Sequence, residues 1–115
     1  MTTLLIFDAH LDLAWNGVEW NRNLELPIAE IRQFEQHFTD IVPGDCTVTF
    51  EEMHRGQIKM CIATLLPRMH RKDKPLTFYQ SREAAHGAAL GQLGYYRALC
   101  AKGVMRELST GDDVS

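Results

Sequence analysis

Two short apolar segments stand out in the pattern of hydrophobic and polar positions along the chain. The first, over residues 3–9, contains four consecutive apolar residues, and the second, over residues 57–66, places apolar side chains on both of its faces. Short segments that are apolar on both faces are typical of parallel strands buried inside a sheet. We therefore expect one strand at residues 3–9 and a second at residues 57–66.

Apolar residues after Pro27 recur at a spacing of three or four positions, which predicts an amphipathic helix. Pro27 suits the first helical position, because its missing N–H would have no partner there. Glu35 falls on the polar face of this predicted helix. The apolar face consists of Ile28, Ile31, Phe34 and Phe38.

A short helix is predicted over residues 50–55 from the signals at its two ends. Thr49 and Glu52 have the spacing of a capping box, in which a threonine hydroxyl accepts from the backbone at the start of a helix. Gly56 follows the last predicted turn, and we expect it to adopt the left-handed conformation that often ends helices.

The last helix is predicted over residues 77–102, where an apolar stripe has helical spacing and Gly103 provides a stop. The resulting order is strand, helix, short helix, strand and long helix. This order favours a parallel α/β architecture with right-handed crossovers. The connection at residues 15–26 contains Trp15 and Trp20, which either line a pocket mouth or cover the end of a barrel.

The candidate chemistry lies at the end of the first predicted strand. Asp8, His10 and Asp12 occupy every second position, and alternate side chains of an extended strand point to the same side. With Cα atoms about 6.5–7 Å apart, His10 and Asp12 can reach a single ion. Imidazole with carboxylate suits zinc or a similar divalent ion. Polar residues that cap the turn after a strand produce the same pattern.

The stretch Asp-Ala-His-Leu-Asp-Leu-Ala-Trp-Asn at residues 8–16 resembles the opening of the membrane (renal) dipeptidase family. Residues 51–65 are similar to the short helix, Arg-Gly turn and second strand of its bacterial branch, and residues 91–99 to the following helix. The resemblance covers essentially the whole chain but only the front portion of the family's domain. Three positions that are not metal ligands depart from the commonest motif, namely Ala9, Leu11 and Ala14.

This resemblance implies the N-terminal βα units of a metal-dependent hydrolase with a (β/α)₈ TIM barrel. Such a barrel needs about 250 residues, so residues 1–115 are expected to be part of one barrel domain that is incomplete at its C-terminal end. The implied activity is that of a zinc-dependent dipeptidase, a metallopeptidase with two zinc ions. In it, His10 and Asp12 bind the first zinc.

The resemblance also implies that the bridging glutamate, the two histidines of the second zinc and the substrate-binding residues would lie after Ser115. A catalytic zinc has about three protein ligands, and this chain supplies two of them. We therefore expect no catalytic residue within this chain and no activity from the chain alone. The basic loop at residues 67–75 could bind an anionic group of a substrate, although a solvated loop is the simpler interpretation.

Two other functions remain open. In the first, the chain is a small non-enzymatic α/β domain in which Asp8, His10 and Asp12 only satisfy backbone groups. In the second, it belongs to another amidohydrolase-type enzyme. Most of these carry His-x-His on the first strand, and Asp12 in place of the second histidine is evidence against this function. A downstream reading frame with a glutamate after a third strand and two later histidines would identify the dipeptidase-like barrel.

The charge and composition of the chain limit the classes of partner that we expect. The net charge of −3 combines −8 over residues 1–53 with +5 over residues 54–115, and no basic stripe alternates with aromatic residues, so we expect no nucleic-acid partner. No run of 18 apolar residues exists, and no basic residue precedes Arg22, so neither a membrane span nor a signal peptide is expected. The expected partner is a dipeptide substrate, and a homo-oligomer remains open.

The three widely spaced cysteines are expected to be reduced and not to bind metal, which is typical of a protein in the cytoplasm. They are Cys46, Cys61 and Cys100.

Overall fold

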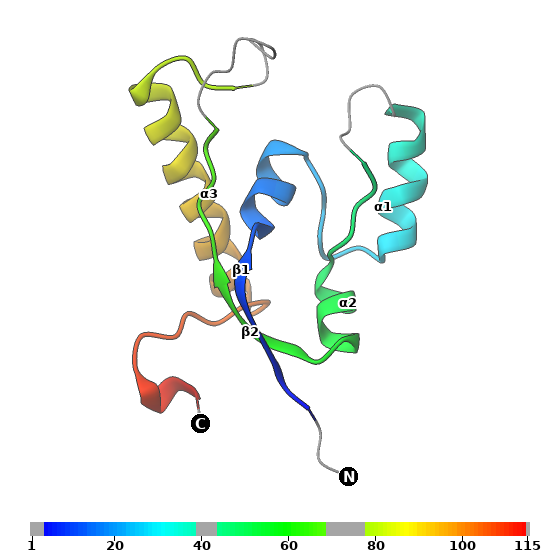
Figure 1. Ribbon diagram of the computed structural model, residues 1–115, viewed down its shortest axis with the longest axis vertical. Coiled ribbons are helices and arrows are strands. Elements are labelled where there is room, and N and C mark those ends of the chain that lie inside the picture. Colours follow the sequence, from blue (N-terminus) through cyan, green and yellow to red (C-terminus); the bar gives the residue numbers. More distant parts are fainter. Residues whose placement is uncertain (1–3, 39–43, 69–77, 115) are drawn as a thin grey trace. The chain divides into compact units, whose positions relative to one another are not determined.

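The computed structural model describes residues 4–38, 44–68 and 78–114, and the chain forms two compact units, residues 1–66 and 67–115. Both strands belong to the first unit (Figure 1). Its elements are β1 (Ile6–Leu11), a π-helical turn η1 (Trp15–Glu19), α1 (Ile28–Glu35), a 3₁₀ turn η2 (Gln36–Phe38), α2 (Phe50–Arg55) and β2 (Ile58–Ala63). The second unit contains α3 (Arg82–Lys102) and a 3₁₀ turn η3 (Gly111–Val114).

The two strands pair in parallel, which confirms the orientation predicted from their apolar patterns. β1 begins later than predicted and continues two residues further, through Leu11. The pairing is irregular, because β1 advances three positions from Asp8 to Leu11 while β2 advances two from Cys61 to Ala63. Extra residues of this kind bend a strand and turn its side chains. His10 lies within this irregular part of β1, between Asp8 and Leu11.

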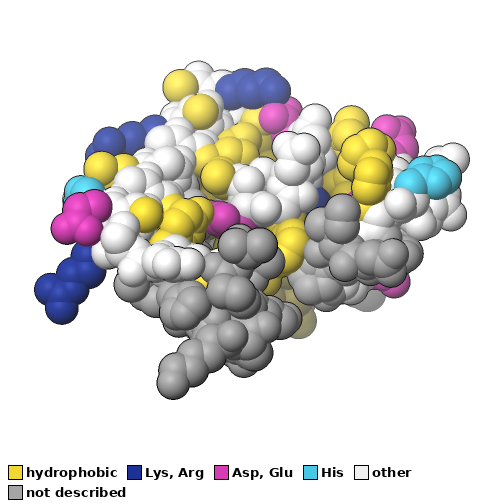
Figure 2. Space-filling view, turned by 90° about the horizontal axis from the view of Figure 1, so that it is seen from above, with side chains coloured by type: hydrophobic (Ala, Val, Ile, Leu, Met, Phe, Trp, Pro, Cys, Tyr) yellow, Lys and Arg dark blue, Asp and Glu magenta, His cyan; other side chains and the backbone are white. Residues whose placement is uncertain are grey.

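Much of the apolar surface of the strands is open to solvent. The described residues form a sheet of two strands, so few neighbours are available to cover side chains that suit the middle of a larger sheet. Leu4 is 74% exposed and Phe7 is 50% exposed. On the face of the molecule seen in Figure 2, where strands are not marked, hydrophobic side chains likewise lie between charged ones. Uncovered apolar strands with a free edge favour association with further strands or chains.

The buried residues of the first unit lie mainly after β1 and not over the sheet. Leu13 and Ala14 directly follow Asp12 and are fully buried. The backbone that leaves the end of β1 is therefore held by packing. The other fully or nearly fully buried apolar residues of this unit are Leu24, Ile31 and Cys46.

Helix α1 buries Ile31, as its sequence predicts, but the rest of its buried face differs from the prediction. Pro27 precedes the helix as its N-cap residue, and its carbonyl accepts from the backbone N–H of Glu30. Glu35 is buried, whereas Phe34 is 62% exposed. The prediction that Glu35 lies on the polar face was wrong, because the guanidinium of Arg22 provides a buried partner for its carboxylate.

Helix α2 has the predicted bounds and the predicted start. The Thr49 hydroxyl accepts from the backbone N–H of Glu52 at 3.2 Å. The prediction that Gly56 adopts the left-handed conformation was wrong, because its φ is −79°. The left-handed residue is the next one, Gln57, with a φ of 62°. A glycine at position 56 still relieves crowding, since a Cβ there would lie 3.2 Å from the Glu52 carbonyl oxygen.

In the second unit, α3 begins at Arg82, five residues later than predicted. The Ser81 hydroxyl accepts from the backbone N–H of Ala84 and so caps its start. Gly103 ends the helix with φ of 84°, as predicted. None of the described helices combines the length and the hydropathy required to cross a bilayer.

Candidate metal centre

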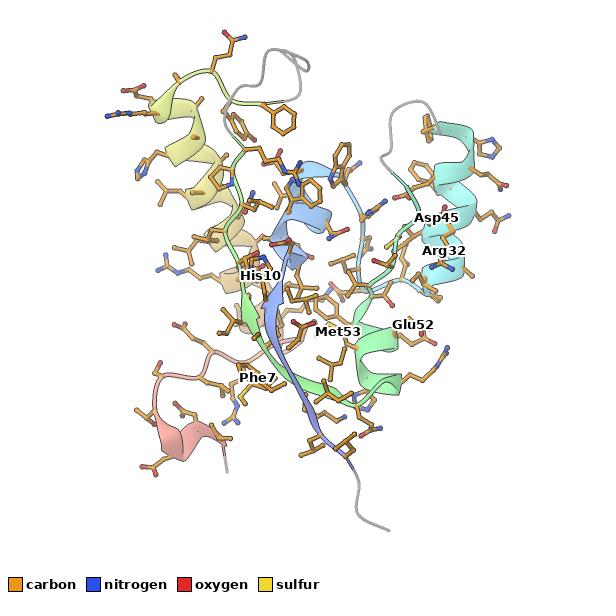
Figure 3. The ribbon with its side chains drawn as sticks, viewed as in Figure 1. Phe7, His10, Arg32, Asp45, Glu52 and Met53 are labelled. Atoms are coloured by element: carbon orange, nitrogen blue, oxygen red, sulfur yellow. The ribbon has the colours of Figure 1, made fainter. Side chains whose placement is uncertain are left out.

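The structure brings His10 and Asp12 together at the carboxyl end of β1. The Nε2 atom of His10 lies 3.3 Å from the Oδ1 atom of Asp12. Figure 3 shows His10 at the tip of the β1 arrow. The His10 side chain is 74% exposed and the Asp12 side chain 29% exposed, so the imidazole is open to solvent and the carboxylate is partly enclosed.

Asp8 has a local role. Its Oδ1 atom accepts a hydrogen bond of 3.0 Å from the backbone N–H of His10. This contact satisfies a backbone group at the irregular part of β1. Asp8 therefore behaves as expected for polar residues that cap a strand end, and the candidate ligand pair consists of His10 and Asp12.

The separation of the two ligand atoms fits a zinc ion. Two ligands of a tetrahedral zinc lie about 3.4 Å apart, given metal–ligand bonds of about 2.0–2.2 Å. The observed 3.3 Å between nitrogen and oxygen is close to this value. Across residues 4–38, 44–68 and 78–114, no group of three or more His, Cys, Asp or Glu side chains is placed to hold a metal. Within this region the candidate donors are therefore the two residues His10 and Asp12.

Thr64 adds a contact to this centre that the pattern of the sequence did not identify. Its hydroxyl donates to the Oδ1 atom of Asp12, and its backbone N–H donates to the carbonyl of Leu11 at 3.2 Å. Thr64 follows β2, so the carboxyl ends of both parallel strands contribute. A signal was available, because Thr64 is the polar residue that ends the apolar series Ile58, Met60 and Ile62.

A polar network that contains Asn16, Arg22 and Glu35 holds the backbone of Asp12 through a hydrogen bond to its carbonyl. The side-chain amide of Asn16 donates to the Asp12 carbonyl at 2.9 Å, and its Oδ1 accepts from Arg22 at 2.7 Å. Arg22 binds both carboxylate oxygens of Glu35, at 2.5 and 3.1 Å, and donates to the Gly44 carbonyl at 2.9 Å. No local pattern of the sequence indicated this network, because Arg22 reaches Glu35 13 positions away and Gly44 22 positions away.

Two tryptophans follow the end of β1. Trp15 and Trp20 pack edge to face with ring centroids 5.6 Å apart. The Trp20 indole Nε1 is buried and has no hydrogen-bond partner in the described part of the chain. Residues 69–75 of the predicted basic loop lie outside the described residues.

All three cysteines are free, as expected from their spacing. Burial raises the pKa of the Cys61 thiol, and the nearby carboxylate of Asp8 raises this pKa further. Both effects disfavour the thiolate, which is the form that binds metals and attacks electrophiles. The Cys61 thiol should therefore react less readily than an ordinary exposed thiol.

No family model, curated protein or solved structure matches this chain.

Proposed function

We propose that this chain is the N-terminal part of a zinc-dependent dipeptidase with a (β/α)₈ barrel. The observation that carries the proposal is the 3.3 Å separation between His10 Nε2 and Asp12 Oδ1 at the carboxyl end of β1. In barrels of this class the chemistry takes place at the carboxyl ends of the strands. The parallel pairing of β1 with β2 and the resemblance of residues 8–16 to the dipeptidase family support the same proposal.

His10 and Asp12 would hold one zinc ion in this protein. A bound zinc supplies acidification of a water molecule and polarisation of a carbonyl group. The contribution of this chain is to orient the imidazole and the carboxylate toward a common point. Because a catalytic zinc has about three protein ligands, we propose that the remaining ligands, including those of a second zinc, come from later strands of the barrel.

A small non-enzymatic α/β domain is the second candidate. It is favoured by the hydrogen bonds of Asp8 and Asp12, since both carboxylates already have partners within the protein. In that case the His10–Asp12 contact is a surface ion pair with no role in metal binding. The two candidates therefore differ in whether zinc binds selectively at His10.

Titration of the 115-residue chain with zinc distinguishes these candidates when the NMR signals of the histidine rings are followed. The chain carries Leu5→Lys, a charge at an exposed apolar position that limits association. We expect zinc to shift the His10 signals at the lowest concentration, with weak affinity because two ligands are present. His10→Ala and Asp12→Ala should abolish this response. His54→Ala is the matched control, because His54 is an exposed histidine of α2 whose Nδ1 contacts Lys59. Equal responses of all histidines would contradict the metal centre.

The dipeptidase activity is tested with the product of the complete reading frame that contains this chain. We expect zinc-dependent hydrolysis of dipeptides by the complete protein, and loss of hydrolysis in the His10→Ala and Asp12→Ala variants. The His54→Ala variant should retain activity. Selective zinc binding without hydrolysis of any dipeptide would leave the metal centre in place and overturn the assigned reaction.

A further inference from the structure

The carboxyl end of β2 places a hydroxyl group against the candidate ligand Asp12. The Thr64 hydroxyl lies within hydrogen-bond distance of two acceptors, Asp12 Oδ1 and, at 3.4 Å, the Leu11 carbonyl. The Leu11 carbonyl already accepts from the Thr64 backbone N–H at 3.2 Å. Since a hydroxyl has one proton to donate, this proton is available to the carboxylate of Asp12.

Asp12 is the fixed member of the ligand pair. Its carbonyl is held by Asn16, its carboxylate is held by Thr64, and the following Leu13 is fully buried. By contrast, His10 lies in the irregular part of β1 and its side chain is mostly exposed. Preorganisation of this centre therefore depends on how firmly the Asp12 carboxylate is oriented.

We propose that Thr64 is a positioning residue for metal binding, whose hydroxyl orients the Asp12 carboxylate toward His10. This proposal rests on the zinc centre proposed above. A carboxylate oxygen has two lone pairs, so Asp12 Oδ1 can accept from Thr64 and still bind a metal ion. Hydrogen bonds of this kind orient a ligand and raise its affinity for the metal.

The size of the effect follows from other metal centres. Removal of a group that orients a ligand typically weakens metal binding by about 10–100-fold. Thr64→Val removes the hydroxyl, keeps the shape of the side chain and leaves the backbone hydrogen bond to Leu11 intact. Thr64→Ser keeps the hydroxyl and loses the methyl group. The two variants therefore separate the hydrogen bond from the packing of this side chain.

The test measures zinc affinity by calorimetry and by the NMR signals of the His10 ring. All variants are made in the 115-residue chain carrying Leu5→Lys, which places a charge at an exposed apolar position to limit association. The amide spectrum of each variant reports its fold in the same sample. Thr49→Val is the matched control, because Thr49 is fully buried in the same unit but its hydroxyl caps α2. This control should lower stability while leaving the zinc dissociation constant unchanged.

We expect the zinc dissociation constant of Thr64→Val to be about 10–100-fold higher than that of the wild type. The dissociation constant of Thr64→Ser should be close to that of the wild type. An unchanged constant in Thr64→Val would overturn the role of Thr64 while the zinc centre stands, provided that His10→Ala and Asp12→Ala abolish binding. Equal weakening in Thr64→Val and Thr49→Val would also overturn it. Absence of zinc binding at His10 in the wild type would overturn both the centre and this proposal.

Discussion

Arg22 and Glu35 form an ion pair with side chains only 7% and 10% exposed. Two charges removed from water in this way require each other, because either one alone would remain buried without compensation. The pair also joins η1, the end of α1 and the segment that precedes α2 through the contacts of Arg22 with Asn16 and Gly44. We expect it to be the most sensitive polar contact of the first unit.

Arg22→Met should lower the free energy of unfolding by about 3–5 kcal/mol, because it leaves Glu35 charged and buried. The double variant Arg22→Met with Glu35→Leu should recover a large part of this loss, since no unpaired charge remains. Urea unfolding measures both values. Arg55→Met is the control, because Arg55 pairs with Glu51 and Glu52 at the surface. Such pairs contribute about 0–1 kcal/mol, and an equal loss in the control would contradict the special role of Arg22.

Alkylation of Cys61 should require a higher pH than alkylation of an ordinary thiol, because burial and the charge of Asp8 raise its pKa. Asp8→Asn removes the charge, so the pH profile of Cys61 alkylation should move to lower pH. Peptide mass mapping measures the rate at this cysteine alone. As the pH rises, the unfolded chain loses the thiol proton first, so the stability due to this group falls. An unchanged profile in Asp8→Asn would contradict the influence of Asp8.

At the residue scale, the sequence predicted that His10 and Asp12 lie close together, but not the contact of Thr64 with Asp12. His10 and Asp12 are neighbours on one strand, so the alternation of side chains is sufficient to bring them together. Thr64 lies 52 positions from Asp12, and their contact depends on the register of two strands with two irregularities. No local pattern encodes that register. The same reason applies to Arg22 and Glu35.

At the scale of elements, two helix ends were predicted correctly. Thr49 and Gly103 act as expected because a cap depends on residues within one turn, whereas the expected left-handed Gly56 was wrong. The inward face of α1 was predicted only in part, because Ile31 is buried as expected but Glu35 is buried where Arg22 can reach it. The bounds of β1 shifted because strand ends depend on the partner strand, which sequence periodicity does not specify.

Gly91→Ala should stabilise α3. Apart from its chain neighbours and the nearby backbone of α3, a Cβ at position 91 would have no heavy atom of the described residues within 4 Å, and alanine is favoured over glycine inside a helix by about 0.8–1.0 kcal/mol. Gly103→Ala should be destabilising, because its φ of 84° strains any residue with a side chain. Thermal unfolding measured by circular dichroism gives both values. A lower midpoint for Gly91→Ala would show that α3 packs closely at this position.

At the scale of the whole molecule, the open apolar surface of the strands predicts association. Leu4-Leu5-Ile6-Phe7 is an uncharged apolar segment that is largely exposed, and such segments at a strand edge promote pairing between chains. We expect the 115-residue chain alone to self-associate and to hydrolyse no dipeptide. This behaviour is expected of strands taken from a larger barrel.

Leu5→Lys should reduce this association, because it places a charge beside β1 at a side chain that is 63% exposed. Sedimentation velocity over a range of concentrations measures the effect. Val114→Lys is the matched control, since Val114 is similarly exposed but lies in η3. A wild-type chain that unfolds cooperatively as a monomer would contradict the truncated barrel and favour the small-domain alternative.

The contacts of Arg22 also have a consequence for the order of events in folding. Its guanidinium requires Asn16, Glu35 and the carbonyl of Gly44, which is 22 positions away. These segments come together only after α1 has formed and the loop beyond it has closed, and loop closure has an entropic cost that precedes any gain. We therefore expect the ion pair to complete late, after the transition state. Its loss should then accelerate unfolding and leave the folding rate almost unchanged, which stopped-flow kinetics of Arg22→Met would measure.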